Sequence, residues 1–330
     1  MAVCSKRGAV MHQALTSVSG ASVTLPALFV PTPAAGKRFI EFFTANIRNP
    51  HTRRAYTRAV VDFSVWCEHV GLTELRALEP VQVAAYVETL QSRLSAPSVK
   101  LHLAALRVLF DWLVVGQQLA VNPASAVKGP KHSTKKGKTP VLTAEEARIL
   151  LDTIDTTTVA GLRDHALISL MVYTFARVGA VLTMQVRDVF VQGRRTWVRL
   201  HEKGGKEHDM PCHHHLEASL HAYLEGAGLV QDDNGYLFRS LAGRSGVLTE
   251  RPLGQSDVHR MIRRRADAAA IQTAIGCHTF RATGITEYLR NGGTLEVAQQ
   301  MANHESARTT GLYDRRQDLI NLDEVERIRI

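Results

Sequence analysis

The sequence is poor in cysteine and has no long hydrophobic run. Four cysteines occur among its 330 residues, at positions 4, 67, 212 and 277, and none has the Cys-x-x-Cys spacing. This scatter argues against a disulfide framework and favours a reducing compartment, which we expect to be the cytoplasm. No apolar run approaches the roughly 20 residues that span a bilayer, so we expect no membrane partner.

The chain also lacks an internal repeat and a low-complexity block. Its opening has a little positive charge, but Gly, Ser, His and Gln interrupt the apolar core that a signal peptide needs. We therefore expect residues 1–35 to form a loosely ordered tail, in preference to a signal peptide. The length is sufficient for two domains that each bury a core.

Positive charge is in excess, and it is unevenly distributed. The formal net charge is +9. Residues 1–137 contain sixteen Lys and Arg against seven Asp and Glu, whereas residues 138–330 contain twenty-four of each kind. A basic first part favours a polyanionic partner such as a nucleic acid.

The first part is predicted to be a small helical domain over residues 36–128. Apolar residues recur at intervals of three and four, and the helical runs are bounded by Pro80, Pro97, Pro123, Gly71 and Gly116.

Arginines gather just before these runs, at Arg53, Arg54 and Arg58. Arg54 and Arg58 are four residues apart and would share one helix face. Such a face is commonly only solvated, but the excess charge in this part makes contact with phosphate at least as well supported.

Residues 129–142 are predicted to be an exposed linker, because they are rich in Lys, Gly and Pro and short of large apolar residues. Lys135 and Lys136 are its candidates for contact with a nucleic-acid backbone. A purely solubilising role for these lysines remains open.

The second part, residues 143–318, is expected to be mostly helical with a small antiparallel sheet. Thr143 and Glu146 have the spacing of a helix start. An apolar helix is predicted to run up to Arg177, two or three short strands follow with turns at Gly193 and at Gly204–Gly205, and helices return from residue 256. The expected fold class is mainly α, of the α+β type.

Side chains suited to chemistry on an anion recur in this second part. His278 and Arg281 are three residues apart and would project from one helix face. Arginine offers a planar fork of donors for phosphate, and histidine exchanges a proton near neutral pH. Arg177 follows an apolar helix, where a guanidinium needs an anionic partner or a water-filled cleft. Lys203 is predicted at the tip of a hairpin.

Together with His304 and Tyr313, these residues resemble the catalytic domain of the tyrosine recombinases, also called the phage integrase family. The likeness lies in four stretches, "ARVGAVLTMQVRDV", "HEKGGKEHDMP", "HTFRAT" and "GGTLEVAQQMANHESARTTGLYDRR". The nine positions from His304 to Tyr313 match the family's spacing. The likeness extends over about residues 36–330, because the basic helical part is similar to the family's core-binding domain.

The resemblance implies a site-specific DNA recombinase or integrase of a mobile genetic element, which cuts and rejoins strands through a 3′-phosphotyrosyl intermediate. Tyr313 would be the nucleophile, and Arg177 and Arg281 would hold the phosphate. One histidine would accept a proton while the other donates to phosphate, and Lys203 would protonate the leaving oxygen. No metal and no cofactor are implied. The implied partners are double-stranded DNA with a specific crossover site and further copies of the chain, in a tetramer.

Two positions depart from the family's pattern. Ala180 stands where an acidic residue is usual beside Arg177, and Asn303 replaces the usual glycine before His304. After glycine, asparagine is the residue that best tolerates a positive φ. Neither departure removes a group that performs chemistry.

Two other functions remain open on the residues alone. Cys212 and the three histidines after it are potential metal ligands, although consecutive side chains are expected to diverge. Residues 294–313 also have the pattern of a helix-turn-helix, so a DNA-binding regulator without catalysis is the alternative. A regulator would have no use for Lys203 or the His-x-x-Arg pair.

The last residues, 319–330, combine a near-helical apolar stripe with an alternating Arg-Ile end. Such a segment cannot bury its apolar side alone. We expect it to dock in trans on a neighbouring subunit, in preference to folding back on its own domain. A tail passed between subunits would let one active site respond to the next.

Overall fold

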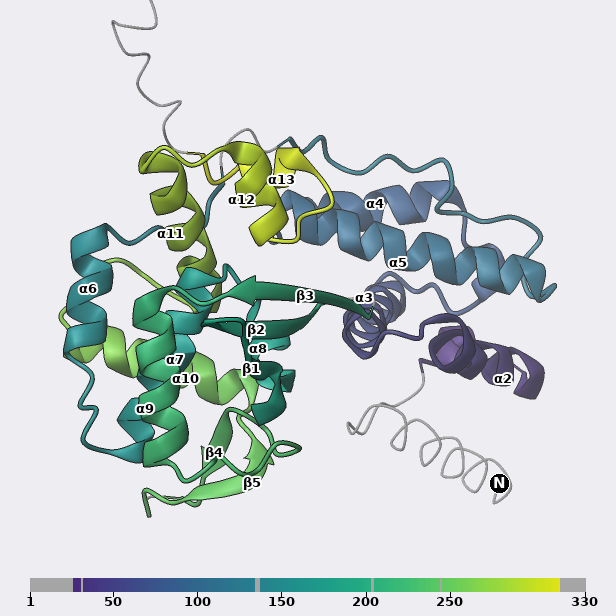
Figure 1. Cartoon of the computed structure of the whole chain (residues 1–330). Coiled ribbons are helices and arrows are strands. Elements are labelled where there is room, and N and C mark those ends of the chain that lie inside the picture. Colours follow the sequence, from purple (N-terminus) through teal and green to yellow (C-terminus); the bar gives the residue numbers. More distant parts are fainter. Residues whose placement is uncertain (1–25, 31, 134–136, 203–204, 244, 315–330) are drawn as a thin grey trace, which may run out of the picture. The chain divides into compact units, whose positions relative to one another are not determined.

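The chain divides into two units between Ser133 and Thr134, within the stretch predicted as a linker. The structure, a computed structural model, describes residues 26–314 except 31, 134–136, 203, 204 and 244 (Figure 1). Each unit is considered by itself. No helix within the described residues is long and apolar enough to cross a membrane.

Unit 1 is helical, as predicted for the first part of the chain. Its helices are the α-helices α2 (Pro33–Glu41), α3 (Pro50–His69), α4 (Pro80–Gln91) and α5 (Ala96–Val115), together with short helices at Ala27–Phe29, Phe42–Asn46 and Leu75–Ala77. Helix α3 begins earlier than the apolar pattern indicated, because Asn49 caps it by accepting hydrogen bonds from two backbone N–H groups and Pro50 occupies its first turn.

Helices in unit 1 begin and end near the proline and glycine residues that were predicted to bound them. Pro80 opens α4, and Gly71 follows α3 with a φ of +77°, a conformation that glycine adopts without strain. The core is mainly aliphatic and includes several packed aromatic rings. Phe63 packs edge-on against Tyr86 with ring centroids 5.0 Å apart, and both side chains are fully buried.

Unit 2 is mostly helical with small antiparallel sheets, which confirms the predicted fold class. Its α-helices are α6 (Ala144–Asp152), α7 (Val159–Tyr173), α8 (Val178–Thr183), α9 (His214–Gly226), α10 (Gln255–Ala268), α11 (Cys277–Arg290), α12 (Leu295–Met301) and α13 (Ala307–Gly311), and Val186–Asp188 forms a 3-10 turn. Helix α6 starts as predicted, because Thr143 and Glu146 bond each other's backbone N–H in a capping box.

The predicted strands form a three-stranded sheet of β1 (Val189–Gln192), β2 (Arg195–Glu202) and β3 (Lys206–Pro211), in the order β1-β2-β3. Gly193 and Gly205 have positive φ at the two turns, whereas Gly204 is outside the described residues. A second sheet, β4 (Arg239–Leu241) with β5 (Leu248–Pro252), was not predicted.

The sheet places alternate residues of β2 against the core. Thr196, Val198, Leu200 and Glu202 are buried, whereas the residues between them are partly exposed. This alternation is the period-2 pattern of a strand with one buried face. It brings a carboxylate, Glu202, to the inner face at the end of the strand.

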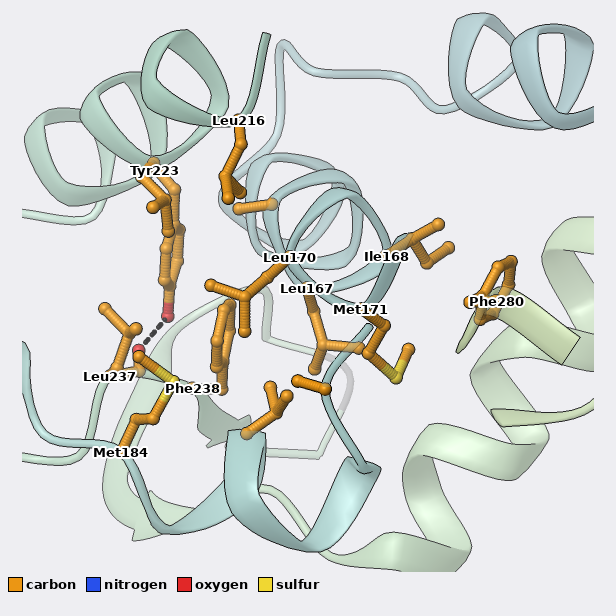
Figure 2. Close-up of a cluster of buried hydrophobic side chains, with 14 of the residues drawn as sticks. Leu167, Ile168, Leu170, Met171, Met184, Leu216, Tyr223, Leu237, Phe238 and Phe280 are labelled. Carbon is orange, nitrogen blue, oxygen red and sulfur yellow. Dashed lines mark hydrogen bonds between the residues drawn. The ribbon is translucent and has the colours of Figure 1, made fainter. Parts of the chain in front are cut away.

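The main core of unit 2 is packed around α7. Figure 2 shows its side chains, with Leu167, Ile168, Leu170 and Met171 projecting from that helix toward Leu216, Phe238, Phe280 and their neighbours. The one buried hydroxyl drawn there, on Tyr223, donates to the backbone carbonyl of Leu237 at 2.8 Å. This apolar block holds α7 and α11, on which the candidate site depends.

The apolar helix before the first candidate arginine ends sooner than predicted. Helix α7 stops at Tyr173, because the Thr174 hydroxyl donates to the carbonyl of Leu170 and Phe175 turns to a φ of +55°. The prediction that the helix continues to Arg177 is therefore wrong. Arg177 instead occupies the N-cap position of α8, where its side chain makes no capping hydrogen bond.

Candidate functional site

Five of the six predicted catalytic residues lie in one region of unit 2. They are Arg177 at the start of α8, His278 and Arg281 on α11, His304 between α12 and α13, and Tyr313 directly after α13. The sixth, Lys203, lies outside the described residues. The helices that carry or adjoin these residues, α8, α11, α12 and α13, are labelled in Figure 1.

A short hydrogen bond joins the side chains of His278 and Tyr313. The histidine Nε2 and the tyrosine hydroxyl oxygen are 2.6 Å apart. Burial lowers the pKa of His278, and the nearby charges of Arg281 and Arg177 lower it further. The imidazole is therefore neutral near pH 7 and can accept the tyrosine's proton.

Tyr313 is held on several sides. Its side chain is 6% exposed, its backbone N–H donates to the carbonyl of Thr310, and its own carbonyl accepts from the Thr286 hydroxyl at 3.0 Å. Burial raises the pKa of Tyr313, although the charges of Arg281 and Arg177 act in the opposite direction. The hydroxyl is thus protonated at neutral pH and needs a proton acceptor.

His304 lies flat against the same tyrosine. The two rings are parallel to within 4°, with centroids 6.0 Å apart. The Nδ1 of His304 is 2.9 Å from the hydroxyl of buried Thr310. Burial lowers the pKa of His304 to about 3, and Arg281, Arg177 and His278 contribute to that shift. This second imidazole is therefore also neutral.

Arg281 is the most deeply buried cation of the site, with 1% of its surface exposed. Its two terminal nitrogens donate to the backbone carbonyls of Phe175 and Ala302. Its Nε is buried and has no hydrogen-bond partner among the described residues. Burial lowers its pKa to about 10, so the guanidinium stays charged at neutral pH. The fork thus braces the α12–α13 region, and its Nε–H is left without a partner among the described residues.

Arg177 is paired with a residue that sequence reasoning missed. Its Nη1 is 2.7 Å from Oε2 of Glu202, whose side chain is only 5% exposed while that of Arg177 is 41% exposed. The signal that could have found Glu202 is the period-2 pattern of β2, which points every second residue inward.

The two departures from the family's pattern have structural consequences. Asn303 has a φ of +46°, so the position does require the left-handed conformation that asparagine tolerates. Ala180 is 5% exposed and brings no charge to Arg177.

Unit 1 presents two of its three predicted arginines at the surface. Arg54 and Arg58 are exposed on α3, whereas Arg53 is half-buried and its Nε donates to the carbonyl of Ile47 at 3.0 Å. Lys135 and Lys136 lie outside the described residues, as do residues 319–330.

The histidine cluster differs from its predicted geometry. The rings of His213, His214 and His215 do not diverge, since neighbouring centroids are 4.1 Å apart, and His213 stacks on Tyr173 at 4.4 Å. Within the part of the chain that the structure describes, no group of three or more potential ligands could hold a metal ion.

Comparison with known proteins gives a consistent result. The sequence model described as the phage integrase family matches residues 140–319, and that of the phage integrase N-terminal SAM-like domain matches residues 37–117. A relative named tyrosine recombinase XerC, from Myxococcus xanthus, is 28% identical over 283 residues, which cover 83% of this chain and 91% of the relative. Tyrosine recombinase XerD from Corynebacterium glutamicum is 28% identical over 274 residues, covering 80% and 86% of the two chains.

Solved structures share the fold. The XerH site-specific recombinase bound to palindromic difH substrate, in a post-cleavage complex, superposes with a TM-score of 0.68 at 19% identity, covering 97% of this chain and 94% of that chain. A lambda integrase fragment in a dimer bound to a COC′ core site gives a TM-score of 0.63 at 17% identity, covering 86% and 96%.

Proposed function

The chain belongs to the phage integrase family, the tyrosine recombinases, and we propose on this basis that it is a site-specific DNA recombinase. Its substrate is double-stranded DNA carrying a specific crossover site. The observation that supports the chemistry best is the 2.6 Å contact between His278 and the Tyr313 hydroxyl. A nucleophile and its proton acceptor are expected within this distance of each other.

In the proposed reaction the Tyr313 oxygen attacks the phosphorus of one phosphodiester. A bond forms between that oxygen and phosphorus, the bond from phosphorus to the 5′ oxygen breaks, and the DNA 3′ end is left linked to tyrosine. The tyrosine's proton passes to His278. A 5′ hydroxyl from a second strand reverses these steps, so the bond energy is retained and no nucleotide cofactor is required.

The cations stabilise the negative charge that develops on the non-bridging oxygens. Arg177 is partly exposed and can donate to these oxygens, and the unused Nε of Arg281 is a further donor. His304 adds a third donor: when the Thr310 hydroxyl donates to Nδ1, the ring's proton is on Nε2. Since these donors are fixed by the protein, they need no metal ion to assist them.

Protonation of the leaving 5′ oxygen is assigned to Lys203 on the family's pattern. The residue is outside the described part of the chain, so this role rests on its place in the sequence "HEKGGKEHDMP". Contact with the DNA phosphates is assigned to Arg54 and Arg58, and in smaller part to Arg53. Lys135 and Lys136 of the linker are assigned the same role.

Assembly is part of the proposal. Exchange of strands between two duplexes requires four cleavages, which one tyrosine per chain supplies in a tetramer. We propose that residues 319–330 dock on a neighbouring subunit and that the protein acts in the cytoplasm, as an integrase of a mobile element. Deleting residues 319–330 then impairs pairing of two sites while leaving binding to a single half-site intact.

The alternative is a DNA-binding regulator without catalysis. The free energy needed to bury polar side chains at this site argues against it. Burying Arg281 and Tyr313 removes polar groups from water without any benefit to DNA binding at a surface. The metal enzyme is not supported, for the reason given for the histidine cluster.

The test is the capture of a covalent intermediate. Purified protein is incubated with sheared genomic DNA of its source, the mixture is denatured in detergent, and DNA that remains attached to protein is sequenced. The proposal expects one recurrent sequence that ends at the point of attachment. A regulator would leave no DNA attached after denaturation, and that result would overturn the proposal.

A further inference from the structure

The ion pair between Arg177 and Glu202 is the feature of the site that the proposed mechanism does not use. Arg177 stands directly before the short helix α8, and position 180 of that helix is an alanine, so α8 offers no carboxylate there. The carboxylate comes instead from another element, the last residue of β2.

Burial of this carboxylate requires an explanation. The Glu202 side chain is 5% exposed, and an ionised carboxylate in such a place is stable only when it is paired and hydrogen-bonded. Its contact with Arg177, at 2.7 Å, is a charge-assisted hydrogen bond. The strand's alternation fixes the direction of the side chain, because Val198 and Leu200 lie on the same buried face.

We propose that Glu202 is a positioning residue for Arg177, which it holds through Nη1 so that the remaining N–H groups of the guanidinium are free for the scissile phosphate. A guanidinium has five N–H donors in a fixed plane, and one anchored nitrogen sets the orientation of the others. The proposal rests on the recombinase function proposed above. It assigns to Glu202 no contact with the DNA.

Glu202 also balances charge between the two arginines. Arg177 is close enough to act on Arg281, since the charge of Arg177 lowers the pKa of Arg281 while that of Glu202 raises it. Two cations without a nearby anion would repel each other before DNA arrives. The carboxylate therefore keeps Arg177 in place in the DNA-free protein.

The first test replaces Glu202 by glutamine, which has the same shape and no charge. Half-site affinity and the single-turnover cleavage rate at saturating protein are measured on a nicked duplex carrying the sequence recovered by covalent capture. Glu202→Gln is expected to bind within about twofold of the unmodified protein and to cleave about 10- to 100-fold more slowly, less than the ~10²–10³ caused by loss of a whole donor. Cleavage at the unmodified rate would overturn the proposal.

Glu207→Gln is the matched control. Glu207 is on β3 of the same sheet, is 61% exposed, and lies near Arg199 and His201 instead of Arg177. Its substitution removes the same charge and is expected to leave cleavage unchanged. If both variants slow cleavage equally, the effect is one of general charge and the positioning role is wrong.

A double-mutant cycle separates positioning from a structural effect. In an Arg177→Ala background, Glu202→Gln is expected to cause no further loss of rate, because the residue it orients is absent. An equal loss in both backgrounds would mean that Glu202 acts independently of Arg177.

If Glu202→Gln does not fold, the cycle is repeated with Glu202→Asp. This variant keeps the charge but withdraws it by one methylene, and it is expected to slow cleavage by a smaller factor. Cleavage by Glu202→Asp at the unmodified rate, or an equal loss in both backgrounds, would then contradict the proposal.

The outcomes distinguish this inference from the function on which it rests. If the unmodified protein forms no covalent adduct, the recombinase function fails and Glu202 has nothing to position. If the unmodified protein forms the adduct and Glu202→Gln forms it equally fast, only the positioning role fails.

Discussion

The two units of the chain use arginine in opposite ways. Arg54 and Arg58 of unit 1 are exposed on one helix, whereas Arg281 of unit 2 is 1% exposed and bonded to two backbone carbonyls. Exposed arginines exchange counterions for DNA phosphates at little desolvation cost, which suits a reversible grip. A buried, fixed guanidinium stabilises charge at one atom, which suits catalysis.

The same contrast explains the uneven net charge. Unit 2 contains charges that offset each other inside the protein, such as Asp164, which is 0% exposed between Arg163 at 2.7 Å and Arg265 at 2.8 Å. The pair of Arg177 with Glu202 is a second example. A balanced sum in residues 138–330 therefore does not mean that the region lacks cations for phosphate.

The largest effect is expected from the buried arginine. Arg281→Lys keeps the charge but loses the fork, so the single-turnover cleavage rate should fall by about 10²–10³ while half-site affinity changes little. The matched control is Arg290→Lys, a more exposed arginine on the same helix, which should cleave normally. If Arg281→Lys instead binds DNA much more weakly but cleaves normally in saturated complexes, Arg281 serves binding and not catalysis, and the contrast between the units is wrong.

A smaller effect, on binding alone, is expected from the exposed pair. Replacing Arg54 and Arg58 with alanine should weaken DNA affinity and reduce the slope of log affinity against log salt by up to about two units, while saturated complexes still cleave. Lys37→Ala with Arg76→Ala removes two charges elsewhere on unit 1 and serves as the comparison. An unchanged salt slope would show that α3 does not contact phosphate.

Structural features that depend on residues close together in the sequence could be predicted from it, whereas features that join distant residues could not. The start of α6 at Thr143, the turn at Gly193 and the shared face of His278 and Arg281 all follow from neighbours within about four residues, and each was predicted correctly. Local chemistry is sufficient for such features.

Features that join distant segments were not predicted. The Arg177–Glu202 pair spans 25 positions, and the bond from Arg281 to the Phe175 carbonyl spans 106. The early end of α7 depended on the backbone at Phe175, which no pattern of apolar residues reveals. The sequence therefore predicted the reactive groups but not the residues that hold them.

The dependence of stability on pH should report the burial of His304. Its pKa falls from an ordinary 6.5 to about 3, so between these values the unfolded chain binds a proton that the folded chain does not. Stability should therefore fall as the pH is lowered through this window. Between pH 7 and pH 5, His304→Asn should lose less stability than the unmodified protein, by up to about 2 kcal/mol in denaturant unfolding. The control is His259→Asn, which replaces an exposed histidine and should lose as much stability between pH 7 and pH 5 as the unmodified protein does. If His259→Asn instead retains as much stability as His304→Asn, burial is not the cause.

The smallest effect concerns the turn before His304. Because Asn303 has a φ of +46°, Asn303→Ala should cost about 1 kcal/mol of folding free energy, whereas Asn303→Gly should be nearly neutral. Thermal unfolding of the two variants measures this difference directly. Equal stability would indicate that the turn relaxes out of the left-handed region.

If Tyr313 and His278, whose side chains are 2.6 Å apart, perform the chemistry, the most direct measurement identifies the residue attached to DNA. The captured adduct is digested with nuclease and protease, and the peptide that carries a nucleotide is sequenced by mass spectrometry. The account predicts the nucleotide on Tyr313, and predicts that Tyr313→Phe binds the same DNA without forming an adduct. A nucleotide on another tyrosine, such as Tyr288 on α11, or an adduct formed by Tyr313→Phe, would contradict it.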